Sequence, residues 1–327
     1  MRGVFYERQG AAREVLELQE LPDPAPGPGE ALVRVMASGV YPADCNRRAG
    51  RGHVLDVPRV IPHSDGAGVV QAVGEAVDPA WVGRRVWCYN AQRGRAFGTA
   101  AQFVALEASL LWELPEQVGF EEGACLGIPG MTAWCALFED GSLNGQTVLV
   151  TGGAGAVAHY AIQLAVHAGA RVLSTASSPL KASQALEAGA LYCADYRDPE
   201  CARQLLAAAP GPITRVIDVD FGRNLPTLLA VAAENATVVA YASRTDEAPR
   251  LPFYALLRRN LRLHALYLAT LPPALRRAAQ AGIDAWLRHG RAIHRVCGVF
   301  PLCRTADAHE AVERGDKLGT VVVRPWD

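Results

Sequence analysis

The chain has 327 residues, 50% of them hydrophobic, and a formal net charge of −1. This length predicts two domains, each large enough to bury a core of its own. Basic and acidic residues are interspersed, which argues against nucleic acid or an anionic membrane as a partner.

The cysteines and the apolar runs indicate the cellular compartment of the protein. The eight cysteines contain no Cys-x-x-Cys pair, and a chain with a substantial core does not depend on disulfides, so we expect free thiols and no zinc site built from them. The first residues lack the apolar core of a signal peptide, and no apolar run reaches the roughly 18 residues of a membrane span. We therefore expect a cytoplasmic protein.

The first part of the chain, to about residue 120, predicts β-structure. Short apolar runs at 15–18, 31–35, 68–73, 85–88 and 101–105 are separated by proline and glycine, a pattern typical of a barrel or compact sheet. The segment 21–29 contains four prolines, which remove hydrogen-bond donors and fix φ. It is predicted to be a surface loop between two strands.

From residue 121 onward the pattern alternates between helix and strand. Helical patterns at 121–128 and 132–138 come first. Strands are expected over 147–151, 171–175, 191–194, 215–219, 237–241 and 261–267, and helices over 156–168, 180–188, 199–208 and 223–233. This alternation predicts a parallel sheet covered on both faces. A helix after Pro272-Pro273 to about residue 288 and a strand over 320–324 are expected to return to the first domain.

A glycine-rich turn follows the first strand of this second part. Gly152 permits a tight exit from the strand, Gly155 permits close approach to a pyrophosphate, and the small Ala158 lets the next helix pack near the sheet. The backbone amides of Ala156 and Val157 open that helix and suit an anion. An alignment beginning at Gly153 fits equally well. We predict nucleotide binding, with a plain strand-to-helix turn as the alternative.

The end of the next strand indicates which nucleotide. An acidic residue there would bind the ribose 2′-hydroxyl of NAD(H), but this chain has Ser177, Ser178 and Lys181 instead. Hydroxyl and ammonium donors suit a 2′-phosphate, so the prediction is NADP(H). Tyr196 and Arg197, after the third strand, are further candidates. Alternatively, Ser178 simply caps the next helix and Lys181 is solvated.

His63 invites comparison with a catalytic zinc site. The position that would supply the ligand falls on Ser64, one residue later, and neighbouring strand residues point to opposite faces. No cysteine occurs in the partner segment 38–41, so we predict no metal site. His63 is expected to line a cleft or to bond to the backbone.

Over essentially its full length the chain resembles the zeta-crystallin-like quinone oxidoreductases, a zinc-free branch of the medium-chain dehydrogenase/reductase superfamily. The resemblance rests on the glycine turn, on Ser64-Asp-Gly-Ala-Gly-Val-Val70, and on the segments 21–35, 38–44, 126–134 and 306–311. It implies an α/β fold in which a Rossmann doubly wound parallel sheet domain is inserted into a GroES-like β-barrel catalytic domain. The expected boundaries are 1–120 and 267–327 for the catalytic domain and 121–266 for the NADP(H)-binding domain.

The resemblance also implies an activity. NADPH, bound in a cleft between the domains, would deliver a hydride to a quinone or another α,β-unsaturated carbonyl, without zinc, in a homodimer joined through Rossmann edge strands. The alternatives are an enoyl-type reductase of a dedicated pathway and an NADP(H)-binding protein with little catalysis.

Site residues follow from the same resemblance. Tyr41 and Asn46 are the catalytic candidates, at positions where relatives commonly carry Asn and Tyr, with loop packing as the alternative. The expected substrate-pocket residues are His63 and Trp87, and the further cofactor contacts are Thr132, Ser243 and Tyr267. Thr132 could instead bond within its helix, and Tyr267 could lie in a dimer interface. Ala156 and Ala158 replace glycines of relatives, which narrows the turn.

Overall fold

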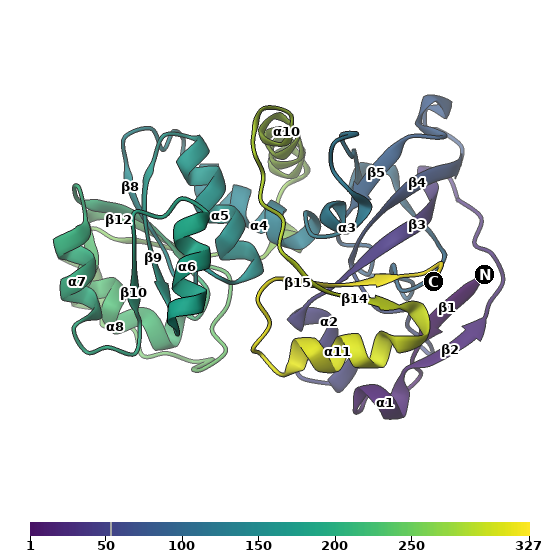
Figure 1. Ribbon diagram of the computed structural model, residues 1–327, viewed down its shortest axis with the longest axis horizontal. Coiled ribbons are helices and arrows are strands. Elements are labelled where there is room, and N and C mark those ends of the chain that lie inside the picture. Colours follow the sequence, from purple (N-terminus) through teal and green to yellow (C-terminus); the bar gives the residue numbers. More distant parts are fainter. Residues whose placement is uncertain (53) are drawn as a thin grey trace. The chain divides into compact units, whose positions relative to one another are not determined.

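The computed structural model describes residues 1–52 and 54–327 and divides the chain into two compact units (Figure 1). The first unit comprises Met1–Ile128 and His294–Asp327, and the second comprises Pro129–Ile293. The boundaries expected from the sequence fall after residues 120 and 266. The second boundary differs because helix α10 (Pro273–His289) packs within the second unit, where Trp286 contacts the Tyr160 ring edge-on.

A seven-stranded sheet dominates the first unit. Its strand order is β14-β15-β3-β4-β5-β7, with β6 also paired to β3. The bounds are β3 Glu30–Val40, β4 Asp65–Val73, β5 Arg85–Cys88, β6 Phe103–Glu107, β7 Leu111–Glu113, β14 Val296–Pro301 and β15 Thr320–Arg324. Burial alternates along most of β3, as expected for a strand with one face on a core. The predicted return of strand 320–324 to the first domain is confirmed by its pairing with β3.

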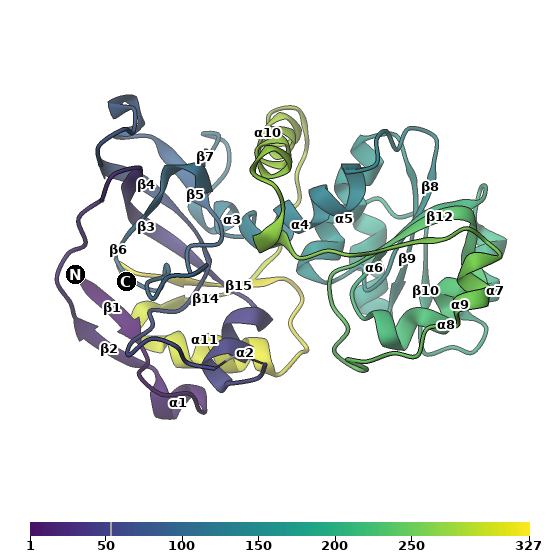
Figure 2. The same cartoon turned by 180° about the vertical axis from the view of Figure 1, so that it is seen from behind.

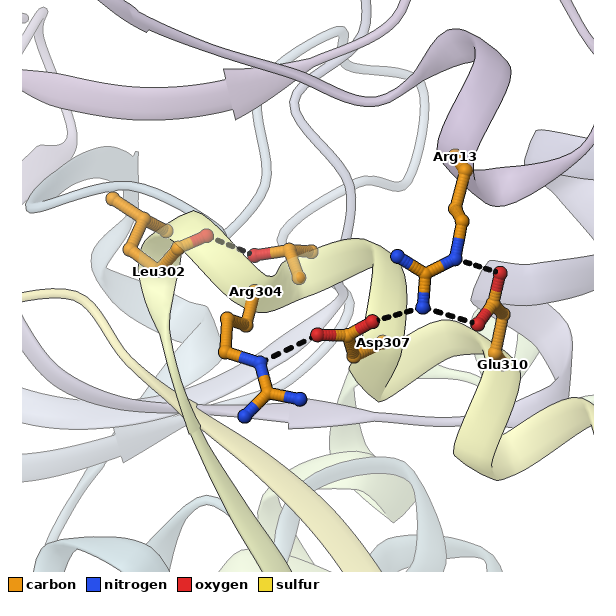
Figure 3. A network of polar contacts seen from close by, with 6 residues as sticks. Arg13, Leu302, Arg304, Asp307 and Glu310 are labelled. Carbon is orange, nitrogen blue, oxygen red and sulfur yellow. Dashed lines mark hydrogen bonds and ion pairs between the residues drawn. The ribbon is translucent and has the colours of Figure 1, made fainter.

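Short helices and a hairpin complete the first unit. They are β1 (Arg2–Phe5) paired with β2 (Glu17–Glu20), α1 (Ala12–Val15), α2 (Pro42–Ala49), α3 (Phe120–Gly123), α11 (Thr305–Glu313) and the 3-10 turns η1 (Pro79–Trp81), η2 (Ala108–Leu110) and η4 (Leu302–Arg304). An ion-pair network joins α1 to α11: Arg13 pairs with Asp307 and Glu310, and Arg304 also pairs with Asp307 (Figure 3).

The second unit contains a six-stranded, all-parallel sheet of order β10-β9-β8-β11-β12-β13. The strands are β8 Thr147–Val150, β9 Arg171–Ala176, β10 Tyr192–Asp195, β11 Ile213–Asp218, β12 Ala232–Ala240 and β13 Arg262–Ala265. Because the order runs outward on both sides of β8, this is the doubly wound arrangement predicted from the sequence.

Helices cover both faces of that sheet. Helices α5 (Ala156–His167) and α6 (Pro179–Glu187) contact each other on one face, and α7 (Cys201–Ala208) and α8 (Phe221–Val231) contact each other on the opposite face (Figures 1 and 2). The remaining elements are α4 (Gly127–Phe138), which begins in the first unit and continues into the second, α9 (Phe253–Leu257) and η3 (Leu268–Thr270).

Helix α2 was not predicted from the sequence, and loop packing was the alternative considered for Tyr41 and Asn46. Pro42 occupies the first helical position, and the Tyr41 amide donates to the Asp44 carboxylate at 2.8 Å. Both features favour a helix start. Residues 15–18 were expected to form one strand, but α1 ends at Val15 and β2 starts at Glu17.

All eight cysteines are free thiols, as the sequence predicted. Within residues 1–52 and 54–327, no helix has the length and apolar character needed to cross a membrane.

Candidate functional site

The carboxyl ends of the parallel strands gather most residues predicted to bind a cofactor. Open α/β sheets bind ligands at this edge, beside the point where strand order reverses. That point lies between β8 and β11. The residues following the strand ends are the glycine turn after β8, Ser177 and Ser178 after β9, Tyr196 after β10, Asp220 after β11 and Ser243 after β12.

Hydrogen bonds from two backbone amides to Thr175, on the neighbouring strand, hold the glycine turn. Gly152 has φ of +66°, which an L-residue with a side chain rarely adopts, and its amide donates to Thr175 Oγ1 at 3.1 Å. The Gly153 amide donates to the Thr175 carbonyl. A Cβ on Gly153 would lie 2.2 Å from Ser174 Oγ, so close packing requires glycine here.

Gly155 is the N-cap of α5, with an ordinary φ of −72°. The turn therefore requires glycine at Gly152, because of its positive φ, and at Gly153, because of close packing. Gly153 is the first glycine of the alternative alignment. The amides of Ala156 and Val157 open a helix of 12 residues and have no carbonyl of their own helix to bind. Together with the helix dipole, such amides favour an anion.

A buried carboxylate that the sequence analysis missed organises this turn. Asp218, at the end of β11, is fully buried and accepts hydrogen bonds from Thr151 Oγ1 and Asn224 Nδ2, each at 2.7 Å. The Thr151 hydroxyl also accepts the Val219 amide. Burial raises the pKa of Asp218, and these hydrogen bonds oppose that rise. The signal available in the sequence was an acid, Asp218, directly after the apolar pair Val216-Ile217 of a predicted strand.

The residues after β9 support both interpretations offered for them. Ser178 is the N-cap of α6, and its hydroxyl accepts the Lys181 amide at 3.3 Å. Ser178 therefore caps the helix, as the alternative stated. The side chains of Ser177 and Lys181 are half-buried. Among the described residues, neither carboxylate nor carbonyl oxygens bind the Lys181 ammonium, so it can receive an anion.

Tyr196 and Arg197 differ in the contacts that their side chains make. Arg197 binds both carboxylate oxygens of Asp195, at 3.0 and 2.6 Å. Tyr196 is tied to the end of β9, because its amide donates to the Ala176 carbonyl. The Arg223 guanidinium lies over the Tyr196 ring, 4.7 Å from the ring centroid. Arg223 was not predicted from the sequence.

The two cofactor candidates later in the chain, Ser243 and Tyr267, differ in their surroundings. Ser243 Oγ accepts the Gly222 amide at 2.9 Å and donates to the Asp246 carbonyl, so its hydroxyl proton is already used. Tyr267 precedes η3 and its side chain is 66% exposed. Ser243 thus braces the loop after β12, and Tyr267 is a surface residue of this unit.

Thr132 lies on α4 and is buried. Its hydroxyl makes no hydrogen bond to another described residue. The expected alternative, a bond within its own helix, is therefore not seen, and this hydroxyl keeps its capacity for a ligand.

In the first unit, the two catalytic candidates lie on or beside α2. The Tyr41 hydroxyl donates to the Ala124 carbonyl at 2.9 Å, and its side chain is buried. Gly39 leaves room for this contact, since a Cβ there would lie 2.4 Å from the same carbonyl oxygen. The single phenolic proton of Tyr41 is thus engaged. Asn46 is half-buried in the helix.

His63 belongs to a buried chain of hydrogen bonds, and the donors fix its direction. Thr99 donates to the Asp65 carbonyl at 2.6 Å, so Ser38 must donate to Thr99 at 2.7 Å. His63 Nδ1–H then donates to Ser38 Oγ, and His63 Nε2 accepts from His309 Nε2–H at 3.0 Å. Burial lowers the pKa of His63 to about 3 and that of His309 well below its usual value.

The positions of His63 and Trp87 correct the expectation that they face a pocket. His63, with φ of +77°, bonds to side chains and not to the backbone. Trp87 lies on β5 between its partners on β4 and β7. Both side chains are fully buried, because core packing and, for His63, hydrogen bonds enclose them on all sides.

A second buried carboxylate, Asp65, stands close to Tyr41. Its Oδ2 accepts the Ile128 amide at 2.6 Å, and a Cβ on Gly127 would lie 2.2 Å from its carboxyl carbon. Burial raises the pKa of Asp65 well above its usual value. Asp65 therefore anchors the start of α4 in the first unit.

The donor set does not fit a catalytic zinc. His63 and His309 approach each other, but within residues 1–52 and 54–327 no group of three or more His, Cys, Asp or Glu side chains could hold a metal ion. Three protein ligands are the usual minimum for catalytic zinc.

Comparisons with known proteins agree with this architecture. Two family models match: the alcohol dehydrogenase GroES-like domain over residues 27–116 and the zinc-binding dehydrogenase domain over residues 156–281. The quinone oxidoreductase of Pseudomonas aeruginosa is 32% identical over 232 residues, which are 70% of each chain. That of Sus scrofa is 29% identical over 306 residues, 91% of this chain and 90% of the other.

Solved structures extend the similarity to the whole chain. The structure of mycobacterial Rv1454c complexed with NADPH aligns with a TM-score of 0.86 at 28% identity, covering 99% of this chain and 100% of that one. A GroES-like unit and a doubly wound unit with a glycine turn, in one chain, define a medium-chain dehydrogenase/reductase. This chain belongs to the quinone oxidoreductase-like members of that superfamily and is an oxidoreductase.

Proposed function

We propose that this protein uses NADPH to transfer a hydride to a quinone or another activated alkene, without zinc. The observation that carries the proposal is the end of β9, where Ala176 is followed by Ser177 and Ser178 and no carboxylate is present to bind a ribose 2′-hydroxyl. The Lys181 ammonium, without an ion-pair partner among the described residues, suits a 2′-phosphate. The NADPH complex of the similar mycobacterial protein supports the same cofactor.

Each part of the chain has a distinct task in this proposal. The Gly152 turn and the first amides of α5 bind the pyrophosphate, Ser177 and Lys181 bind the 2′-phosphate, and Thr132 offers a hydroxyl to the rest of the cofactor. When bound, NADPH supplies the hydride. The protein then needs to orient the reactants and exclude water. Zinc independence is supported by the absence of a fitting donor set among the described residues.

The activity is tested by following NADPH oxidation with a panel of quinones and enones, with and without a chelator. Turnover that survives the chelator is expected. Turnover that disappears with metal removal and returns with Zn²⁺ would overturn the zinc-free assignment.

A second candidate function is NADP(H) binding with little catalysis, and the Tyr41 hydroxyl favours it. That hydroxyl already donates to Ala124, so Tyr41 is not free to protonate a substrate in this conformation. An enoyl-type reductase remains the alternative among enzymes. Tight NADPH binding without turnover of any quinone or enone would favour the binding role.

We also propose a cytoplasmic homodimer joined through β13. This strand is the edge of its sheet and pairs with β12 alone among the described strands. Apolar residues around it are exposed: Phe253, Tyr254, Leu257 and Leu263. Unpaired edges and apolar patches favour association, and free thiols suit a reducing compartment. Light scattering should give a dimer, and Leu263→Pro should give a monomer.

A further inference from the structure

We propose that Arg223, held on the ring of Tyr196, is a second cation for the 2′-phosphate and a determinant of cofactor selectivity. The inference rests on the proposed NADPH function and names a residue for its phosphate end. It also assigns Tyr196 a positioning role, through its ring and not through its hydroxyl.

The position of Tyr196 supports this assignment. Its amide is bonded to the carbonyl of Ala176, the last residue of β9, and Ser177 follows directly. The ring of Tyr196 therefore stands beside the strand end that receives the ribose. A cation stacked on that ring lies next to the same strand end. Arg223 reaches the ring from α8, which follows β11, and β8 and β9 separate β11 from β10 in the sheet.

The first turn of α8 is held firmly enough to aim Arg223. The Gly222 amide donates to Ser243 Oγ at 2.9 Å, and a Cβ on Gly222 would lie 2.6 Å from the Asp246 carbonyl oxygen. The Asn224 side chain binds Asp218 at 2.7 Å. The residues on both sides of Arg223 are thus fixed, while its own side chain is exposed.

Among the described residues, no carboxylate forms an ion pair with Arg223. Asp195 is bound by Arg197, and Asp220 accepts the amide and hydroxyl of Thr245. Among the described residues, the contact of the Arg223 guanidinium is the Tyr196 ring. A cation–π contact uses the face of the guanidinium, so it orients the side chain and leaves the N–H donors for an anion.

A guanidinium and an ammonium differ in what they offer. Arg223 can present two parallel N–H donors to phosphate oxygens, whereas Lys181 acts as a point charge. Two cations without ion-pair partners among the described residues, Lys181 after β9 and Arg223 on the Tyr196 ring, match a dianionic 2′-phosphate better than one. Binding of the phosphate would therefore depend on both, and on the ring that positions Arg223.

The test compares adenosine 2′,5′-bisphosphate with 5′-AMP, which lacks only the 2′-phosphate, by calorimetry on the full chain. Arg223→Ala should weaken the bisphosphate about tenfold, the range of one charge-assisted interaction, and leave 5′-AMP within about twofold. Arg223→Lys should weaken binding of the bisphosphate less than Arg223→Ala does. Arg203→Ala, which removes an equal charge from α7 where Arg203 pairs with Glu200, serves as the control and should change neither ligand.

Tyr196 variants separate ring from hydroxyl. Tyr196→Phe should keep the selectivity, Tyr196→Leu should lose it as Arg223→Ala does, and the double variant Tyr196→Leu/Arg223→Ala should be no worse than either. Unchanged selectivity in Arg223→Ala, or equal loss in Tyr196→Phe and Tyr196→Leu, would overturn the inference. If the unmodified protein does not prefer the bisphosphate at all, the NADP(H) proposal itself fails.

Discussion

Thr151 Oγ1 donates a hydrogen bond to Asp218 Oδ1 across 2.7 Å and ties the carboxyl end of β8 to that of β11. These two strands flank the point where strand order reverses. The glycine turn leaves β8 directly after Thr151, so its path depends on this bond. Asp218 is thus the organiser of the edge at which we expect the cofactor.

Asp218→Ala should therefore be strongly destabilising. It leaves the buried Thr151 hydroxyl without its acceptor, at about 1–3 kcal/mol, and the half-buried Asn224 amide without its partner. Asp218→Asn keeps one acceptor oxygen and should cost less. Urea unfolding measures both, with Glu247→Ala, at an exposed position of the same unit, as a control expected within about 0.5 kcal/mol. Equal stability of Asp218→Ala and the unmodified protein would contradict this role.

The doubly wound sheet could be predicted from the sequence because hydrophobic strands and helices alternate at regular spacing. The six strands and helices α5 to α8 were expected, most with ends within two residues, although β12 starts five residues earlier than expected and α9, between β12 and β13, was not expected. Gly152 was recognised for the same local reason, since a positive φ follows from its place between strand and helix.

Side-chain partners over long sequence separations could not be predicted in this way. Arg223 meets Tyr196, and His63 meets His309, only after the chain has folded. The burial of Trp87 likewise depends on which face of β5 meets the core, and a four-residue strand does not settle that in sequence. Helix α2 is different, because its start signals, Pro42 and the Asp44 carboxylate three residues after Tyr41, are local and were available in the sequence.

Tyr41→Phe tests whether the Tyr41 hydroxyl is structural. Removing it leaves the Ala124 carbonyl without this donor, so the free energy of unfolding should fall by about 1–3 kcal/mol. If Tyr41 acts mainly through this bond, kcat with a quinone should change less than tenfold. A loss of several hundredfold in kcat with unchanged stability would show instead that the hydroxyl serves the reaction.

The buried His63 and His309 pair predicts a loss of stability in acid. Both are neutral when folded because burial lowers their pKa, to about 3 for His63. Unfolded histidines, with pKa near 6.5, bind protons below that pH, so the unfolded state is favoured as pH falls from about 6.5 towards 3. Each histidine contributes a slope of about 1.4 kcal/mol per pH unit.

Asp44 acts in the opposite direction, because burial raises its pKa to about 7. Its stabilising contribution is present below its unfolded pKa near 3.9 and is lost as pH rises towards 7. The variant His63→Gln/His309→Gln, compared with the unmodified protein by urea unfolding at several pH values, isolates the histidine part. The difference between the two proteins should shrink as pH falls below 6.5. A constant difference would contradict the assignment.

Two ion pairs on α11 should differ in their contribution to stability. Arg48 is 1% exposed and pairs with Glu313 at 2.6 Å, whereas Arg13 is 65% exposed. Glu313→Ala leaves a buried cation without its partner and should cost about 3 kcal/mol or more. Arg13→Ala should cost much less, because its ion pairs are screened by solvent. Thermal unfolding of both variants makes the comparison, and equal losses would contradict it.

The central claim is selectivity for NADPH, and fluorescence titration of the unmodified protein with NADPH and NADH tests it most directly. The absence of an acid after β9, together with the cations at Lys181 and Arg223, predicts a lower Kd for NADPH. Lys181→Ala should narrow the gap by weakening NADPH much more than NADH. Binding of NADH as tight as that of NADPH, or tighter, would contradict the account.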